Sequence, residues 1–323
     1  MKLINYFLSK SNSYSFYKSN YESLKKRDYS NRKKISKFSN EIEMLQIENN
    51  NLTKENKKIV AENNRLTQEN EILIEQKDRL DTIISDIKIS DEYNKKINEE
   101  LKYAFVFNDT IKQSSWLKNK DFSLINAAAN YSFIYLLYKI INDTQPKNIL
   151  EMGLGQTSKL TTQYVDYFED TMLYILEGDS DWIETFSQKL NLDGNVEIFD
   201  MDLEEFEYNG TNNIRFKDVS NVVADNKFDL IIIDGPQGFI CKDNKNINLE
   251  YSRTNIWELI PNNLNDDFII VIDDYERNGE KNTMHRVEEL LKDNDINYYT
   301  YSCNGLKTQY AIFSEKYKFI QWI

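Results

Sequence analysis

Cysteine, histidine and long apolar runs are all scarce in this chain of 323 residues. The two cysteines, Cys241 and Cys303, lie far apart and lack the spacing of a metal site or a disulfide framework, which favours a reducing compartment. No apolar run approaches the roughly 18 residues that span a bilayer. The patch at residues 3–8 is too short and too polar for a signal peptide. We therefore expect a cytoplasmic protein.

The net charge of −13 conceals an asymmetry along the chain. Residues 1–34 contain nine lysines and arginines and two acids, a charge of +7, so the remaining residues carry −20. Such an acidic body argues against duplex nucleic acid as a partner, because binding phosphates requires dense lysine and arginine. The basic, aromatic-containing tail is either poorly ordered or a docking segment for an anionic membrane surface or a protein partner, which would make the protein membrane-peripheral.

Residues 35–88 carry a heptad repeat with an apolar d column and four consecutive asparagines at a. The d positions are Phe38, Leu45, Leu52, Ile59, Leu66, Leu73, Leu80 and Ile87, and the a positions are Ile35, Ile42, Asn49, Asn56, Asn63, Asn70, Lys77 and Ile84. Asparagine at a fixes register and favours two parallel strands. The repeat predicts a homodimer held by a parallel coiled coil about 80 Å long.

Apolar runs alternate with amphipathic windows beyond a mixed connector at residues 89–122. Strands are expected at 148–152, 173–176, 196–199, 228–233, 268–272, 298–301 and 309–313. Helices are expected at 124–141, 157–168, 180–190, 216–225, 250–260 and 281–292. This alternation is typical of an α/β domain with a mostly parallel sheet covered on both faces. The short turn Asn304–Gly305 predicts that the last strand is antiparallel.

The stretch from Asn148 to Thr157 predicts a strand, a glycine turn and a helix. Glu151 ends the apolar run, and Gly153 and Gly155 follow it. This arrangement brings backbone close to a nucleotide-like ligand. Two glycines alone are common in ordinary tight turns, so the signal depends on the acids around them.

Acids follow nearly every expected strand. They are Glu151, Glu177, Asp200 or Asp202, Asp234, and Asp273 with Asp274. Ligands of doubly wound sheets bind at the carboxyl ends of the strands, where these acids would gather. Each acid alone could cap a helix, but five strand ends with the same feature favour a functional edge.

Three segments resemble class I S-adenosylmethionine-dependent methyltransferases. They are Leu150-Glu-Met-Gly-Leu-Gly-Gln156, Leu176-Glu-Gly-Asp179, and Ile231-Ile-Ile-Asp-Gly-Pro236 with Ile272-Asp-Asp-Tyr275. The resemblance covers about residues 145–315 and implies a Rossmann-like, seven-stranded, mostly parallel sheet with an antiparallel seventh strand within residues 123–323. A nicotinamide-binding turn would have a third glycine where this chain has Ser158.

The resemblance implies that S-adenosylmethionine is the cofactor and assigns its contacts. Gly153 and Gly155 would pass beneath the methionine part, with Glu151 near its amino group. Glu177 would bind the ribose hydroxyls. Asp202 would cap the adenine amino group, and Asp200 is the rival for that role.

Asp234, Asp273 and Asp274 resemble the metal ligands of magnesium-dependent O-methyltransferases, although the second residue of the final pair is often Asn there. Three carboxylates suit a hard divalent cation such as Mg²⁺. The alternative is that the Asp pair caps its turn and Asp234 orders the following loop. Asp234 and the sole histidine, His285, are the candidate catalytic bases, although a histidine that only packs a helix or faces solvent is the plainer interpretation.

Asp234-Gly-Pro-Gln-Gly238 also resembles a signature of methyltransferases that act on sugars and polysaccharides. Arg253 could bind an anionic group of such a substrate or form a salt bridge. The favoured function is therefore O-methylation of a glycan hydroxyl, with the coil linking the enzyme to a glycan-assembly partner. The alternatives are an inactive domain on a coiled-coil scaffold and an enzyme using another nucleotide, such as a dehydrogenase.

Overall fold

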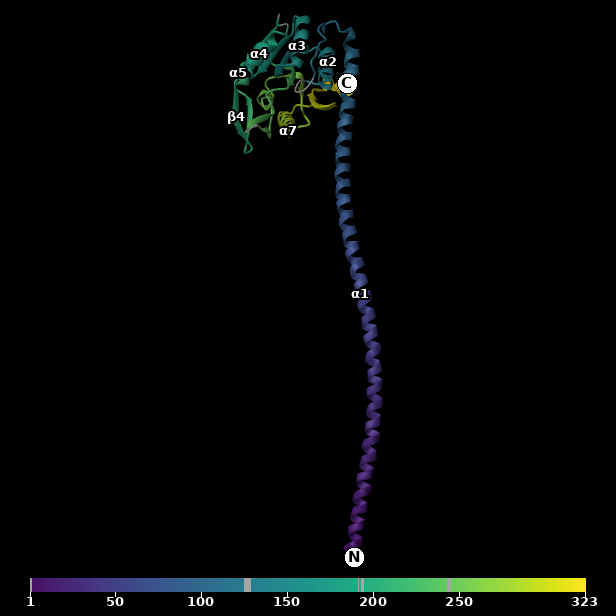
Figure 1. Cartoon of the computed structure of the whole chain (residues 1–323). Helices are drawn as coiled ribbons and strands as arrows, with labels where there is room; N and C mark the ends of the chain where they lie inside the picture. The colour runs from purple at the N-terminus through teal and green to yellow at the C-terminus, as the bar shows by residue number, and fades with distance from the viewer. Residues whose placement is uncertain (1, 125–128, 191, 193–194, 243–244) are drawn as a thin grey trace. The chain divides into compact units, whose positions relative to one another are not determined.

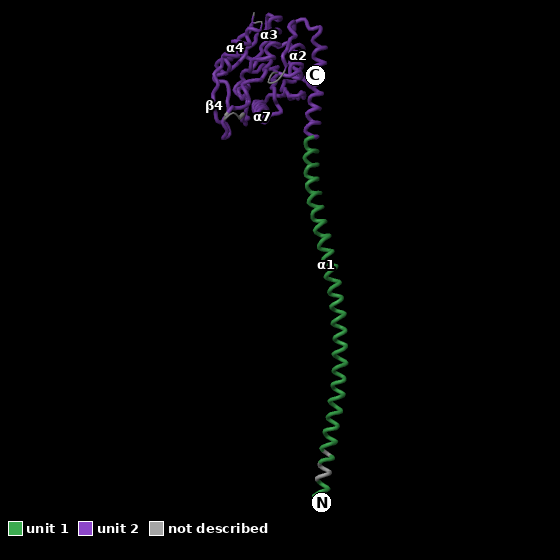
Figure 2. The backbone as a smooth tube through the Cα atoms, in the orientation of Figure 1, with its two compact units in different colours: residues 1–86 green, residues 87–323 purple. Residues whose placement is uncertain are grey.

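The chain forms two compact units, residues 1–86 and residues 87–323, coloured separately in Figure 2. The structure, a computed structural model, describes residues 2–124, 129–190, 192, 195–242 and 245–323, apart from the side chains of residues 6–9, 12, 242 and 245. Among these residues no helix combines the length and the apolar character needed to cross a membrane.

The first unit consists of one helix, the larger part of α1 (Lys2–Thr110), which is continuous over 109 residues (Figure 1). The predicted tail at 1–34 is helical from residue 2 onward, and helix also extends into the predicted connector. No glycine or proline interrupts this segment. The d-position leucines are exposed on the single chain, with 53% exposure for Leu52 and 58% for Leu80. A single helix of this length does not bury its apolar stripe in a core of its own. The single chain does not test pairing with a second copy, so the coiled-coil dimer remains a prediction.

The second unit is built on a seven-stranded sheet in the order β10-β11-β9-β6-β1-β2-β3. The strands are β1 (Asn148–Met152), β2 (Met172–Glu177), β3 (Val196–Asp200), β6 (Phe228–Ile233), β9 (Leu264–Ile272), β10 (Tyr299–Asn304) and β11 (Thr308–Phe313). β11 runs antiparallel to both of its neighbours, whereas the other neighbours pair in parallel. The predicted α/β, mostly parallel sheet is confirmed.

Helices cover both faces of the sheet because adjacent strand residues point to opposite sides. Ile149 and Ile232 face a core with α2 (Tyr131–Thr144), α3 (Gln156–Tyr167) and α4 (Ser180–Ser187). Leu150 and Ile231 face a core with α5 (Val219–Val223), α6 (Ile256–Leu259) and α7 (Asn278–Asp293). The first core also contains Phe107 from the end of α1. The short helices η1 (Ile111–Gln113) and η2 (Glu315–Trp322) complete the unit.

Several elements differ from the sequence expectation. α2 begins at Tyr131 rather than near residue 124, and residues 125–128 of the predicted helix lie outside the described part. Two antiparallel hairpins were not expected, β4 (Leu203–Tyr208) with β5 (Thr211–Phe216), and β7 (Phe239–Lys242) with β8 (Lys245–Asn248). β5 takes the start of the helix predicted at 216–225, so α5 is only five residues long.

Candidate functional site

The glycine turn after β1 lies against the loop that follows β6. Gly153 has a φ of +101°, and a Cβ built there would come within 2.9 Å of the Asp234 carbonyl carbon. Its amide donates to the Leu176 carbonyl at 2.8 Å, which holds the turn to the neighbouring strand. A Cβ on Gly155 would meet no atom within 4 Å. Gly153 is therefore required by the backbone packing, whereas Gly155 leaves open space above the turn.

Glu151 is fully buried beneath this turn. Its carboxylate accepts hydrogen bonds from the hydroxyls of Thr157 at 2.6 Å, Ser158 at 2.8 Å and Thr161 at 2.7 Å, all on α3. Burial raises the pKa of Glu151 to about 7, and the three hydroxyl donors oppose that shift. The structure thus places Glu151 as an anchor between β1 and α3. The expected contact with a cofactor amino group does not fit a carboxylate with no exposed surface.

Glu177 lies at the carboxyl end of β2, as predicted, and its carboxylate is oriented by backbone amides. Oε2 accepts from Leu154 N at 2.8 Å, and Oε1 accepts from Gly178 N at 2.7 Å and Asp179 N at 3.1 Å. The Leu154 bond ties Glu177 to the glycine turn. Three amide donors on one carboxylate fix its orientation, so Glu177 presents hydrogen-bond acceptors at a defined position on the sheet edge.

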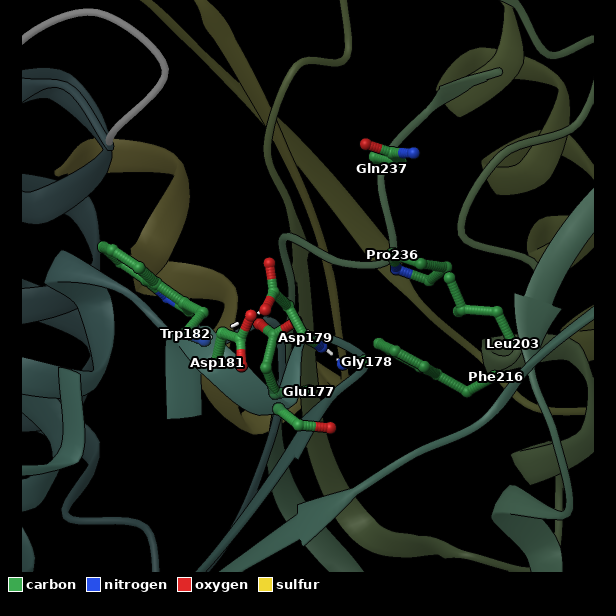
Figure 3. A pocket seen from close by; sticks show the side chains of 10 residues that line it. Glu177, Gly178, Asp179, Asp181, Trp182, Leu203, Phe216, Pro236 and Gln237 are labelled. Carbon is green, nitrogen blue, oxygen red and sulfur yellow. Dashed lines mark hydrogen bonds between the residues drawn. The ribbon is translucent and has the colours of Figure 1, made fainter. Parts of the chain in front are cut away.

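Glu177 lines two adjoining cavities. Cavity A, of about 510 Å³, is lined by Glu177, Gly178, Asp179, Ser180, Asp181, Trp182, Leu203, Phe216, Pro236 and Gln237. Figure 3 shows the acidic side chains and Trp182 on one side of it, with Pro236, Leu203 and Phe216 on the other. A Cβ on Gly178 would touch both Leu203 and Phe216 at 3.3 Å, so these two side chains pack directly over the strand end. Cavity A therefore has the apolar side chains of Leu203 and Phe216 on one side and the Glu177 carboxylate on the other.

Cavity B, of about 680 Å³, extends from the glycine turn to the acids after β6 and β9. Its lining includes Gly153, Leu154, Gly155, Glu177, Trp182, Asp234, Gly235, Pro236, Gln237, Gly238, Arg253, Asp274 and Arg277. Both volumes fall in the range of small-molecule sites. Glu177, Trp182, Pro236 and Gln237 line both cavities, so the two spaces form one continuous candidate site.

Asp202 does not line either cavity, contrary to the expectation that it caps an adenine. Its side chain is exposed beside the β4–β5 hairpin. The rival Asp200 ends β3 and accepts from the Ser180 hydroxyl at 2.7 Å. The unexpected hairpin places the apolar Leu203 and Phe216 in cavity A instead. A flat aromatic ligand would therefore meet apolar side chains here rather than Asp202.

His285 is not brought to the site. α7 buries Glu280, Thr283, Met284 and Val287, and His285 lies on the exposed side of the same helix. With 3.6 residues per turn, a residue one position after Met284 points away from the face that packs on the sheet. His285 lines neither cavity A nor cavity B, so its position gives the expected role as a base no support.

Asp234, Asp273 and Asp274 do come together, as predicted. One oxygen from each carboxylate lies within 4.8 Å of the others, and the group could hold a metal ion. Asp273 is completely buried, Asp274 is nearly so, and the Asp234 side chain keeps 22% exposure toward cavity B. Asp234 is thus the member of the triad that a ligand in the cavity reaches most easily.

Cations of the chain itself contact this triad. Arg253 Nη2 lies 2.8 Å from Asp274 Oδ2 and 3.3 Å from Asp234 Oδ1. Lys307 Nζ lies 3.1 Å from Asp273 Oδ2 and 3.1 Å from Asp274 Oδ1. Sequence reasoning assigned Arg253 to substrate binding or a salt bridge and gave Lys307 no role. Buried ion pairs are the observed outcome for both.

Burial and neighbouring cations act in opposite directions on the pKa values of Asp234 and Asp274. Burial and the neighbouring Asp273 charge raise the pKa of Asp234, and Arg253 opposes them. Burial also acts to raise the pKa of Asp274, but the charges of Arg253, Lys307 and Arg277 outweigh it and lower that pKa. These opposite directions favour Asp274 as a fixed charge and Asp234 as the group that can exchange a proton.

Two residues of the cluster have strained backbones. Both Arg253 and Asp274 have a φ of +59°, in the left-handed region that non-glycine residues seldom adopt. Such conformations cost about 1–3 kcal/mol each and persist where surrounding contacts determine them. The buried ion pair between these two side chains provides such contacts, so the cluster is held in a single arrangement.

No protein-family model and no curated protein matches this chain. Solved structures resemble its backbone. The O-methyltransferase TomG from Streptomyces achromogenes, solved with S-adenosylmethionine, is 13% identical over 69% of this chain and 99% of that one, with a TM-score of 0.44. The methyltransferase PaMTH1 from Podospora anserina is 13% identical over 70% and 93%, with a TM-score of 0.40. A methyltransferase from Geobacter sulfurreducens is 12% identical over 58% and 81%, with a TM-score of 0.38.

The roles of the residues above rest on their own contacts rather than on these similarities. The fold is defined by the sheet itself, with β6 at its centre, β1, β2 and β3 on one side, and the antiparallel β11 between β9 and β10 on the other. By this strand order, the sheet between residues 148 and 313 has the methyltransferase fold that the sequence predicts.

Proposed function

We propose that this protein is an S-adenosylmethionine-dependent O-methyltransferase. The observation that carries the proposal is the position of Glu177. Its amide-oriented carboxylate lies where cavity A, with apolar side chains along one side, meets cavity B, which extends to the acid cluster. A nucleoside with a charged amino-acid arm needs such a pair of spaces, with a ribose acceptor between them. The open side of Gly155 supplies the room for that arm.

S-adenosylmethionine would supply a methyl group on a positively charged sulfur. The acceptor oxygen gains the methyl group and loses its proton, so the site needs a base beside the acceptor. Asp234 lines cavity B, keeps partial exposure and has a raised pKa caused first by burial. In the proposed reaction Asp234 accepts the hydroxyl proton, while Arg253 and Asp274 keep its carboxylate in place.

A hydroxyl of a sugar or glycan is the proposed acceptor. The segment Asp234–Gly238, which resembles that of polysaccharide methyltransferases, lines cavity B and begins beside the glycine turn. Arg277 keeps 37% exposure at the same cavity and could contact polar groups of the acceptor. Arg253 is unsuited to substrate binding because its buried guanidinium is committed to Asp234 and Asp274.

The divalent cation implied by the resemblance would, at Asp234, Asp273 and Asp274, polarise the acceptor hydroxyl. Three carboxylates provide suitable oxygens, one from each lying within 4.8 Å of the others. However, Lys307 lies 3.1 Å from Asp274 Oδ1, and Arg253 contacts the carboxylates of Asp234 and Asp274. These side chains thus leave no open position for a cation among the three carboxylates. The proposed proton transfer to Asp234 does not require a metal.

The coiled-coil homodimer is also part of the proposal. Its support is the exposed d column, including Leu66 with 43% exposure, on a helix that has no other apolar partner within residues 2–86. We further propose that the basic segment at residues 2–34 contacts an anionic membrane surface or a glycan-assembly protein, which would bring the enzyme close to its acceptor.

Calorimetry with S-adenosylhomocysteine and with NAD tests the proposed cofactor. We expect micromolar binding of the first and none of the second. Glu177→Ala should weaken binding by at least about tenfold, which corresponds to 1.4 kcal/mol. Gly155→Arg should abolish binding with the fold intact, because a side chain there meets no protein atom within 4 Å. Glu184→Ala, an exposed acid on α4 outside both cavities, is the matched control.

Binding of NAD alone would assign the site to a different nucleotide enzyme. Binding of neither compound by a folded protein would indicate an inactive domain on a coiled-coil scaffold. Methyl transfer to glycans of the source organism, followed with a labelled methyl donor, then tests the acceptor class.

A further inference from the structure

Lys307 belongs to the turn between β10 and β11, yet its side chain keeps only 16% exposure. The Lys307 side chain points inward, so that its Nζ lies 3.1 Å from one oxygen of Asp273 and 3.1 Å from one oxygen of Asp274. A cation equidistant from two carboxylates is in the bridging position that a divalent ion takes in a carboxylate site.

Arg253 makes the matching bridge on the other side of Asp274. Its Nη2 lies between Asp274 and Asp234, and its Nη1 donates to the Asp273 carbonyl at 2.9 Å. The remaining oxygen of Asp273 accepts from Gln309 Nε2 at 2.7 Å. Among the described residues, the second oxygen of Asp234 alone has no cation or hydrogen-bond donor within these contacts.

The charges of the cluster nearly cancel without any ion. Asp234, Asp273, Asp274 and the buried Glu280 carry four negative charges, and Arg253, Arg277 and Lys307 carry three positive ones. A divalent ion among them would be placed beside two buried cations, and it could bridge Asp273 and Asp274 only after Lys307 had moved. Leaving a buried charge without its partner is strongly destabilising, so this displacement is costly.

We propose that Lys307 is the resident cation of the acidic triad and replaces the divalent ion there. As a positioning residue it fixes Asp273 and Asp274, and through Arg253 it keeps Asp234 beside the acceptor. If the proposed methyl transfer is correct, the reaction then proceeds without a metal. The occupancy of the triad by Lys307 does not depend on that function and can be measured separately.

Titration of the full-length protein with Mn²⁺, followed by calorimetry and by the paramagnetic signal of the free ion, tests the proposal. The wild-type protein should bind no Mn²⁺ at sub-millimolar concentrations, and chelator should not change its melting temperature. Lys307→Ala should gain a Mn²⁺ site at least about tenfold tighter than any wild-type binding, because the triad then has an unpaired charge and an open position. Mn²⁺ should also raise the melting temperature of that variant, because an ion that binds only the folded state stabilises it.

Three further variants make the result specific. Lys316→Ala removes an exposed lysine that pairs with Asp267 at the surface, and it should gain no Mn²⁺ site. Lys307→Arg keeps the positive charge and should therefore bind no Mn²⁺. Lys307→Ala combined with Asp273→Asn should lose the gained site. A merely structural lysine would lower stability in Lys307→Ala without creating a metal site.

Tight Mn²⁺ binding by the wild-type protein would overturn the proposal, and this arm holds even if Lys307→Ala fails to fold. A folded Lys307→Ala protein that gains no Mn²⁺ site would overturn it as well. Binding of S-adenosylhomocysteine is measured on the same samples. Its presence or absence tests the proposed function, whereas the Mn²⁺ titrations test Lys307, so the two ideas fail independently.

Discussion

Glu151 is a carboxyl group with no exposed surface, and burial raises its pKa to about 7 from an ordinary value of 4.5. The folded state therefore holds this proton more tightly than the unfolded state does. Its contribution to stability is fully present below pH 4.5 and is lost as the pH rises to about 7. The loss amounts to at most about 3 kcal/mol.

Urea unfolding of the wild-type protein and of Glu151→Gln across this pH range measures the effect. The stability of the wild type should fall relative to that of the variant as the pH rises. Glu205→Gln, an exposed acid on β4, should follow the wild-type curve. Parallel curves for wild type and Glu151→Gln would show that the three hydroxyl donors outweigh burial and keep the group ionised.

The sequence predicted which carboxylates come together, but it did not predict which cations pair with them. Asp234, Asp273 and Asp274 follow strands, and parallel strands bring their carboxyl ends to one edge. Lys307 follows no such rule, because it lies in a turn and reaches the cluster only through the antiparallel placement of β11. Asp202 and His285 lie outside both cavities for a related reason, since hairpin geometry and helix phase decide where their side chains point.

The start of α2 is capped from outside by the last part of α1. The Glu100 carboxylate accepts from the amides of Tyr131, Ser132 and Leu306 and from the Asn130 side chain. An acid at a helix N-terminus satisfies free amides and complements the helix dipole. This cap is also connected to the site, because Gln309 donates to both Asn130 and Asp273.

Glu100→Ala should therefore destabilise residues 87–323 by about 2–3 kcal/mol, because several donors lose a charged acceptor. Glu99→Ala, one residue earlier, removes only an exposed pair with Lys102 and should cost less than about 0.5 kcal/mol. Chemical denaturation of both variants measures the difference. Equal stabilities would show that water replaces Glu100 at the start of α2.

Elements were predictable wherever an apolar run had to enter the sheet. The seven strands of the main sheet were found within a few residues of their ends. The inner strands β1 and β6 are buried almost throughout and are therefore continuously apolar, whereas the edge strands β3 and β10 are only partly buried. The hairpins β4–β5 and β7–β8 were missed because their strands pair only with each other outside that sheet. Glu204, Glu205 and Glu207 make β4 too polar to be recognised as a strand.

At the scale of the whole molecule, the heptad repeat at residues 35–88 determines whether two chains form the proposed dimer. Leu52→Asp with Leu66→Asp places charges in the d column and should convert the proposed dimer to a monomer, raising the dissociation constant by roughly 100-fold or more. Lys54→Asp with Gln68→Asp changes the outer f positions and should leave the dimer intact. Analytical ultracentrifugation of the full chain distinguishes these outcomes. A monomeric wild-type protein at micromolar concentration would contradict the coiled-coil dimer.

The order of the two units along the chain has a consequence for synthesis. Residues 35–88 are translated before any strand of the sheet, and β1 is not paired on both of its sides until β6 has also been made. Chains fold from the N-terminal side as they emerge from the ribosome. Two neighbouring nascent chains that pair through the proposed coil would therefore dimerise before either sheet has folded. This favours dimers of two chains translated from the same messenger RNA.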